Sequence, residues 1–129
     1  MARPFVYINM AMTADGKITS AAREYPVELP QPTWAEQDIA LVYELAVASM
    51  GEAIAGAGVG EVAAIGLSVH GEAVTPVDAD LRPLRPTILG MDTRTDAQNA
   101  WLRERFGAEE LFRRTGMPVH TINTLPKLL

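Results

Sequence analysis

Residues 62–72, Val-Ala-Ala-Ile-Gly-Leu-Ser-Val-His-Gly-Glu, decide the fold class that the sequence predicts. The run from Val62 to Ser68 is apolar and is bounded by glycine and polar residues, which is typical of a buried strand. Buried strands of this kind belong to α/β folds, in which ligand-binding side chains follow the carboxyl ends of strands. His70 directly follows the predicted strand and is therefore a candidate functional residue, with an ordinary structural histidine as the alternative.

An amphipathic helix is predicted before this strand, over residues 35–55. Its apolar residues recur every three to four positions and therefore lie on one face. Thr33 is the predicted N-cap, with Glu36 completing a capping box, and the glycines within 56–60 end the helix. Because these glycines close a helix instead of opening one, they predict a connector and not a dinucleotide-binding loop.

Shorter elements, each bounded by glycine, proline or polar residues, are predicted in the rest of the chain. They are strands at 5–8, 17–19, 73–77 and 87–89, and helices at 93–106 with Thr93 as cap, at 108–114 and from Thr124 onward. This order of elements predicts an α/β or α+β domain.

Composition limits the classes of function. The 129 residues are 48% hydrophobic and 21% charged, which is typical of a globular domain with a substantial core. The net charge of −5 argues against binding to nucleic acid or to a membrane surface. The absence of cysteine excludes disulfides and thiolate metal sites and fits a cytoplasmic protein. No signal peptide or membrane span is predicted, because Glu44 and Glu52 interrupt the most apolar window, 39–59.

Few side chains are placed where they could carry chemistry. Asp92 and Arg94 follow the last predicted strand, where they either bind hydroxyl groups or cap the next helix. His70 and His120 lie too far apart for a local metal motif, and His120 is expected to pack within a loop. Spacing alone therefore predicts an α/β domain without a defined reaction.

Several segments match the motifs of one known family, in order and with natural spacing. They are residues 23–38, similar to REYP…PGWAEQDP; 63–72, similar to a strand and turn that deliver sugar-binding side chains; 78–94, similar to D.DGRPLRPAILWMDRR; and 110–118 with 124–129, similar to ELFRRTGQP…TLPKLLW. Through these segments the chain from Arg23 onward resembles the N-terminal domain of FGGY-family carbohydrate kinases, of the xylulokinase, gluconokinase and glycerol kinase type.

The resemblance implies a fold, a reaction and a set of site residues. The fold is α/β, a partial ribonuclease-H-like domain of the actin-like ATPase type. The reaction transfers the γ-phosphate of ATP, with Mg²⁺ and an Asp base, to a hydroxyl of a sugar or polyol substrate. The implied substrate-binding residues are Gly71, Glu72, Asp92, Arg94 and His70. Glu72 is the strongest candidate, because a carboxylate accepts hydrogen bonds from two hydroxyls. Gly90 stands where many members carry a tryptophan against the sugar.

Two features of that family are missing from the sequence. The D-x-G-T-[ST] phosphate loop is absent after the first predicted strand, where Gly16 is the only glycine before Gly51. The catalytic Asp and the ATP-binding domain are expected beyond residue 129. We therefore expect no catalytic, cofactor-binding or metal-binding residue in this chain, no bound ATP or Mg²⁺, and no kinase activity without its ATPase domain. Pairing as a homodimer is a further expectation.

The N-terminal residues resemble a different family. The pattern N-x-A-M-[ST]-x-DGKI at 9–18 is similar to the start of the riboflavin-biosynthesis reductase domain, which has a dihydrofolate-reductase-like fold. This predicts a division into a strand and hairpin of reductase origin at 1–22 and a kinase domain at 23–129. A kinase whose own hairpin occupies the segment after loss of the phosphate loop is the alternative. For function, the alternatives are an NADPH-dependent reductase piece and a non-catalytic chimeric chain.

Overall fold

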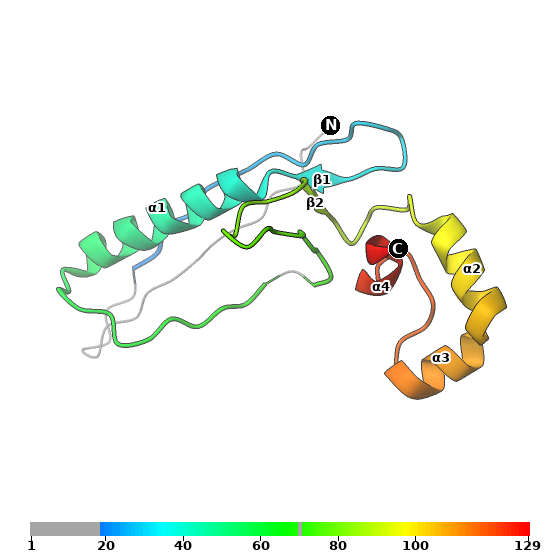
Figure 1. The fold of residues 1–129 in the computed structure, drawn as a ribbon. Coiled ribbons are helices and arrows are strands. Elements are labelled where there is room, and N and C mark those ends of the chain that lie inside the picture. The colour runs from blue at the N-terminus through cyan, green and yellow to red at the C-terminus, as the bar shows by residue number, and fades with distance from the viewer. Residues whose placement is uncertain (1–18, 70) are drawn as a thin grey trace. The chain divides into compact units, whose positions relative to one another are not determined.

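The structure is a computed structural model that describes residues 19–69 and 71–129. Its helices and strands are β1 (Glu36–Gln37), α1 (Ile39–Ala57), β2 (Thr87–Ile88), α2 (Asp96–Phe106), α3 (Ala108–Thr115) and α4 (Thr124–Leu128) (Figure 1). The chain divides into two compact units: among the described residues, unit 1 holds 19–27 and 38–69, and unit 2 holds 28–37 and 71–129. The predicted hairpin at 5–8 and 17–19 lies outside the described residues, apart from Thr19, and so does His70.

Helix α1 of unit 1 confirms the body of the helix predicted from sequence, but the predicted start is wrong. Residues 35–37 are not helical, and Asp38 is the N-cap, whose carboxylate accepts hydrogen bonds from the amides of Ala40 and Leu41. Asp38 is the N-cap instead of Thr33 because its short side chain reaches the first free amides of the helix, while β1 holds the preceding residues extended. Gly58 ends the helix in the left-handed conformation, with φ 67°.

The segment before β1 is hydrogen-bonded to the far half of α1. The Thr19 hydroxyl donates to the carbonyl of Ala53 over 2.8 Å, and Arg23 forms an ion pair with Glu52.

Within the part of the chain that is described, α1 is also the one helix long and apolar enough to cross a membrane by length and composition. The core helix of a soluble protein meets the same test, so this is weak evidence for a span.

No strand is found at 62–68 among the described residues, although the sequence predicts one there. Residues 61–69 pair with no described strand, and Ile65, Leu67 and Val69 are 67%, 84% and 81% exposed. An apolar run becomes a strand only when another strand supplies hydrogen-bond partners along its edge. None of the described residues forms a backbone hydrogen bond with residues 61–69.

Unit 2 is built around the antiparallel pair of β1 and β2. Glu36 pairs with Ile88 and Gln37 with Thr87, so the strand predicted at 87–89 is confirmed as β2. The strand predicted at 73–77 is reduced to isolated bridges, one of which joins Val74 to Ile88. These segments bury a small apolar core that consists of Ala35, Ile88, Leu89 and, from α2, Leu102.

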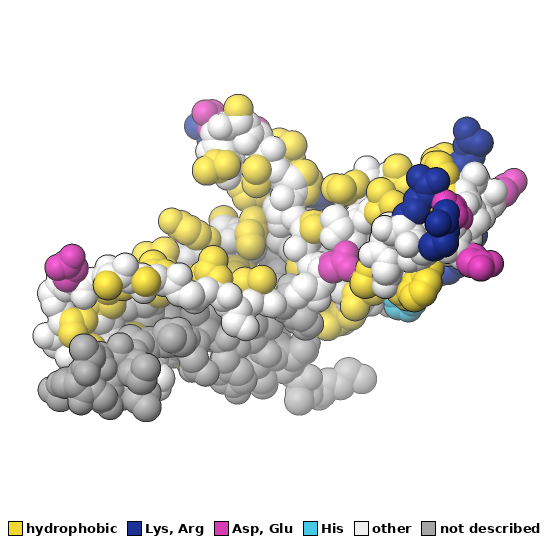
Figure 2. Space-filling view, turned by 90° about the horizontal axis from the view of Figure 1, so that it is seen from below, with side chains coloured by type: hydrophobic (Ala, Val, Ile, Leu, Met, Phe, Trp, Pro, Cys, Tyr) yellow, Lys and Arg dark blue, Asp and Glu magenta, His cyan; other side chains and the backbone are white. Residues whose placement is uncertain are grey.

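The three short helices of unit 2 confirm the predicted helices in that region. The predicted cap of α2 is wrong, because the N-cap is Thr95 and the amide of Thr93 donates to the carbonyl of Thr33 instead. Gly107 separates α2 from α3, with φ 79°. Acidic and basic side chains are intermingled on α2 and α3 (Figure 2), where Glu110 forms ion pairs with successive arginines of α3.

Candidate functional site

The centre of unit 2 is the carboxylate of Asp92, which is fully buried. It lies just after β2 and accepts hydrogen bonds from the backbone amide of Ala35 over 2.7 Å and from the amide of Arg94 over 2.9 Å. The guanidinium of Arg94 donates further hydrogen bonds to both carboxylate oxygens, at 2.6–2.9 Å. Asp92 therefore joins the segment before β1 to the connection between β2 and α2.

Arg94 extends this arrangement to Glu36 of β1. Its Nη1 donates to Glu36 Oε1 over 2.7 Å, and Arg85 reaches the same oxygen over 3.3 Å. The Arg94 Cζ lies 3.7 Å from the centroid of the Trp34 ring, so the cation is held between carboxylates and an aromatic face. We call Asp92, Arg94, Glu36 and Trp34 the buried ionic cluster.

The protonation of the cluster follows from these contacts. Burial acts to raise the pKa of Asp92, but hydrogen bonds from Arg94 and from the Ala35 amide outweigh it, so this pKa lies below the ordinary value. Burial likewise acts to lower the pKa of Arg94, and hydrogen bonds to Asp92 and Glu36 instead raise it above the ordinary value. Both groups are therefore charged at neutral pH, and each compensates the burial of the other.

The predicted pair of Asp92 and Arg94 is thus brought together, with the two side chains facing each other and Glu36. The amide of Arg94 bonds back to Asp92 two residues earlier, which is a local turn motif before α2. From the sequence, Asp92 and Arg94 could either bind hydroxyl groups or cap the next helix. In the structure both oxygens of Asp92 accept hydrogen bonds from groups of the protein itself. Glu36 and Trp34 were missed as members of the cluster, although both lie in the PTWAEQD segment that carried the family resemblance.

A second polar arrangement holds Glu72 against the residues around the start of α4. The Glu72 carboxylate accepts a hydrogen bond from the backbone amide of Thr124. The ammonium of Lys127 donates to the carbonyl of Glu72 over 2.6 Å and to the carbonyl of Ile122 over 2.8 Å. Burial lowers the pKa of Lys127, and the negative charges of Glu72 and Asp92 act against that shift. Sequence reasoning missed Lys127.

Gly90 lies at the point where these segments converge. A Cβ atom placed on Gly90 would lie 3.2 Å from Ile122 Cγ1 and 3.9 Å from the Gly71 carbonyl oxygen. We call Gly71, Glu72, Gly90, Ile122 and Lys127 the Glu72 site. It brings together two of the predicted substrate-binding residues, Gly71 and Glu72, beside Gly90, while His70 is outside the described residues.

The described residues offer no other obvious centre for chemistry. None of them forms a group of three His, Asp or Glu side chains that could hold a metal ion. An open depression of about 360 Å³ is lined by Ala97, Gln98, Trp101 and Leu129, none of which belongs to either polar arrangement. The Glu72 site is therefore the best candidate for binding a polar ligand.

Comparisons with known proteins show that the domain is of the carbohydrate-kinase class. The profile of the FGGY family of carbohydrate kinases, N-terminal domain, matches residues 9–129. The chain belongs to this family. It is 34% identical over 130 residues to the glycerol kinase of Trichormus variabilis, an alignment that covers 98% of this chain and 25% of the relative.

Solved structures agree with this assignment. A xylulose kinase from Rhodospirillum rubrum superposes with a TM-score of 0.79 at 29% identity, covering 91% of this chain and 25% of that one. A kinase described as a xyloylose kinase, from Brucella ovis, gives a TM-score of 0.78 at 32% identity, covering 91% and 24%. The ribonuclease-H-like α/β fold expected from the resemblance is confirmed. The chain spans about a quarter of the length of the relatives it matches.

The reductase resemblance of the N-terminal segment finds no support in these comparisons. The family match begins at residue 9 and so includes most of the segment that resembles the reductase. The glycerol kinase alignment also includes nearly the whole chain. An NADPH-dependent reductase function is therefore unsupported for this chain.

Proposed function

We propose that this chain is the sugar-binding part of an ATP-dependent carbohydrate kinase that phosphorylates a hydroxyl of a sugar or polyol in the cytoplasm. Family membership and the glycerol kinase relatives support the reaction class. The observation that carries the proposal is the carboxylate of Glu72. Thr124 occupies one of its oxygens, while the other has no hydrogen-bond partner among the described residues. A carboxylate oxygen with free lone pairs is the acceptor that a substrate hydroxyl requires.

In this proposal Glu72 contacts the substrate directly, and Gly71 and Gly90 provide the space beside it. Asp92 and Arg94 act from the buried ionic cluster, where they hold the end of β2 in place. His70 is a further contact, on the strength of its position next to Gly71 in the sequence. The substrate class is a polyhydroxylated chain, because hydroxyls complement a carboxylate without requiring a bound cation.

The described residues do not fit ATP and Mg²⁺. They contain no group of three metal-binding side chains, and Arg94 already bonds to Asp92 and Glu36. The nucleotide site of the proposed enzyme then lies in other residues, of a further domain or of a second copy of this chain. Analytical ultracentrifugation of the chain at increasing concentration distinguishes a homodimer from a monomer.

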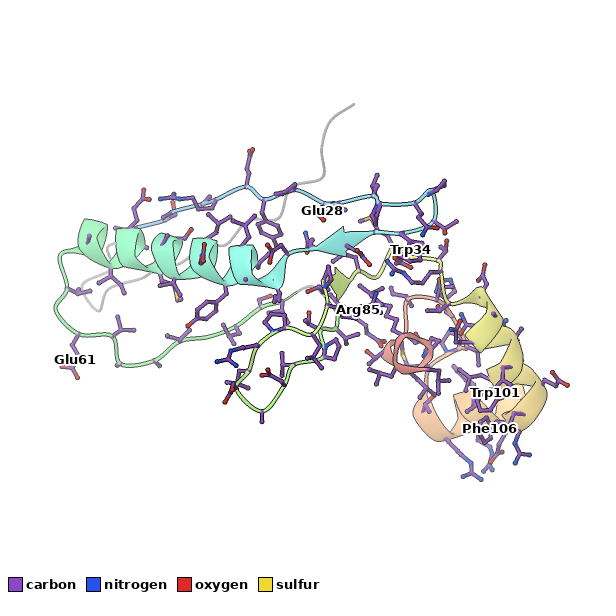
Figure 3. The ribbon with its side chains drawn as sticks, turned by 45° about the horizontal axis from the view of Figure 1, so that its top comes forward. Glu28, Trp34, Glu61, Arg85, Trp101 and Phe106 are labelled. Carbon is purple, nitrogen blue, oxygen red and sulfur yellow. The ribbon has the colours of Figure 1, made fainter. Side chains whose placement is uncertain are left out.

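Equilibrium binding tests the proposal. Isothermal titration calorimetry of the full chain would use glycerol and D-xylulose, to which the names of the relatives point, and D-gluconate, to which the resemblance to gluconokinases points. We expect one of them to bind, and Glu72→Gln to weaken that binding roughly 10- to 100-fold, because a neutral amide replaces the charged acceptor of the hydrogen bond and brings a donor group into its place. Glu61→Gln is the matched control, since Glu61 is an exposed residue of unit 1 (Figure 3). Equal affinity of Glu72→Gln and the wild type would refute the role of Glu72.

A further inference from the structure

We propose that Lys127 is a positioning residue that holds the main chain of Glu72 so that its carboxylate meets the substrate, an inference that rests on the proposed function of the Glu72 site. Lys127 lies in α4, far from Glu72 in sequence. It does not need to touch the substrate to act in this way. Lys127 lies in the family motif at 124–129, but the motif assigned it no role.

The contacts of the Lys127 ammonium give the first part of the argument. Its bonds to the carbonyls of Glu72 and Ile122 tie the turn at 71–72 to the loop before α4. A lysine ammonium carries three donors in a compact head, which suits two carbonyls that approach from different segments. Lys127 thereby links two parts of unit 2 that are separated by 55 residues at the Glu72 contact.

Glu72 is held on both sides by this one stretch of chain. Lys127 binds its carbonyl, and the amide of Thr124 binds its carboxylate. Removing the ammonium frees the main chain that carries the carboxylate, and the contact of the carboxylate with the Thr124 amide then loosens as well. Because small displacements of a binding group cost large factors in affinity, the loss of this anchor is expected to weaken substrate binding.

The burial of Lys127 helps to distinguish a role in positioning Glu72 from a role in stabilising the fold. Burial disfavours its charged form, so the ammonium is not an efficient way to stabilise the unit. A methionine retains most of the apolar stem and carries no charge into the interior. Lys127→Met is therefore expected to leave the unfolding midpoint close to that of the wild type while it weakens binding.

The test measures affinity and stability on the same variants. For whichever of glycerol, D-xylulose and D-gluconate the wild type binds, we expect Lys127→Met to raise Kd roughly 5- to 20-fold, in the range of a lost hydrogen bond to a charged group. In Lys127→Met combined with Glu72→Gln, we expect hardly more loss than in Glu72→Gln alone. Arg103→Met is the matched control, since Arg103 also donates to a carbonyl, that of Val119, over 2.9 Å.

The second readout needs no substrate. In the wild type the NMR signal of the Thr124 amide should show slow exchange of its hydrogen with solvent, because this amide donates to the Glu72 carboxylate. In Lys127→Met this exchange should be faster, because the freed main chain of Glu72 no longer holds the carboxylate against the Thr124 amide. If Lys127→Met fails to fold, Lys127→Leu, which likewise has no donor, replaces it in both measurements.

The outcomes separate the two proposals. If the wild type binds none of the three compounds, the proposed function fails, and the Thr124 signal then decides the role of Lys127. An unchanged Kd or an unchanged hydrogen exchange of the Thr124 amide in Lys127→Met overturns the inference and leaves the proposed function of Glu72 standing. The inference is also overturned if Lys127→Met lowers the unfolding midpoint so far that unfolding alone explains the whole loss of affinity. Lys127 would then have a structural role.

Discussion

The guanidinium of Arg94 lies over the indole ring of Trp34, with its Cζ 3.7 Å from the ring centroid. The same guanidinium bonds to Asp92 and Glu36, so Trp34 covers a cation whose other contacts are anionic. An aromatic face attracts a cation and also shields it from water, which strengthens the ion pairs beside it. This stack therefore joins a motif before β1 to a motif after β2.

Replacing Trp34 should destabilise unit 2. We expect Trp34→Leu to lower the free energy of unfolding by about 1–2 kcal/mol, because the cation–π contact and its shielding of Arg94 are lost. Trp101→Leu is the control, since Trp101 is half exposed and contacts Phe106 edge-on. Urea unfolding followed by circular dichroism measures both. An equal loss in the two variants would contradict a special role for the stack.

The charge of Asp92 should be a main source of acid sensitivity. Its folded-state pKa is lowered, so the carboxylate stabilises the fold at pH values above the unfolded-state pKa of about 4. That contribution disappears as the pH falls through the lower folded-state pKa. Asp92→Asn should lose about 3–5 kcal/mol at neutral pH, because it leaves Arg94 short of a buried partner.

The difference in stability between the wild type and Asp92→Asn should then shrink on acidification. Urea unfolding between about pH 7 and pH 2 measures this difference. Asp80→Asn provides the comparison, since Asp80 is exposed and its ion pair with Arg82 lies at the surface. A difference between Asp92→Asn and the wild type that stays constant with pH would contradict the lowered pKa.

Helix α1 should depend on Asp38 and not on Thr33. Asp38→Ala removes the side chain that accepts from the amides of Ala40 and Leu41, which should cost about 1 kcal/mol. Thr33→Ala should have little effect on the helix, since the Thr33 contact in this structure is made by its backbone carbonyl. Thermal unfolding of the two variants measures the difference, and a larger loss in Thr33→Ala would restore the start predicted from sequence.

Leu81 should be less favourable than glycine at its position. Its φ of 62° is in the left-handed region, and its side chain is 78% exposed, so little packing compensates the strain. The family segment that residues 78–94 resemble has glycine there. We expect Leu81→Gly to raise the free energy of unfolding by about 0.5–1 kcal/mol. Leu84→Gly, at an exposed residue without positive φ, should lower it.

Local signals in the sequence predicted the helices well. Helix α3 lies between Gly107 and Gly116, and the glycine at each end marks its limits in the sequence as in the structure. The start of α1 was not predictable in the same way, because Glu36 is held by its pairing with Ile88. The strand prediction at 62–68 has the same physical weakness. An apolar run forms a strand only beside a partner strand, and the run itself does not specify that partner.

In the candidate site, too, contacts between residues close in sequence could be predicted, and contacts between distant residues could not. Asp92 and Arg94 are two residues apart, so their proximity could be inferred directly. Glu36 meets Arg94 across 58 residues, and Lys127 meets Glu72 across 55, and no spacing rule reaches that far. The resemblance to the family identified Glu72 but not the residues that hold it, because a motif records which residues recur and not which atoms they touch.

Unit 2 is assembled from two stretches of chain with residues 38–69 between them. The extended, exposed residues 59–69 are the natural place for a protease to cut. A single cut there would leave β1 on one peptide and β2 on the other, so the pairing of Glu36 with Ile88 would become an association between two molecules. The unit would then hold together only above a threshold concentration, which makes this chain a candidate for split-protein complementation.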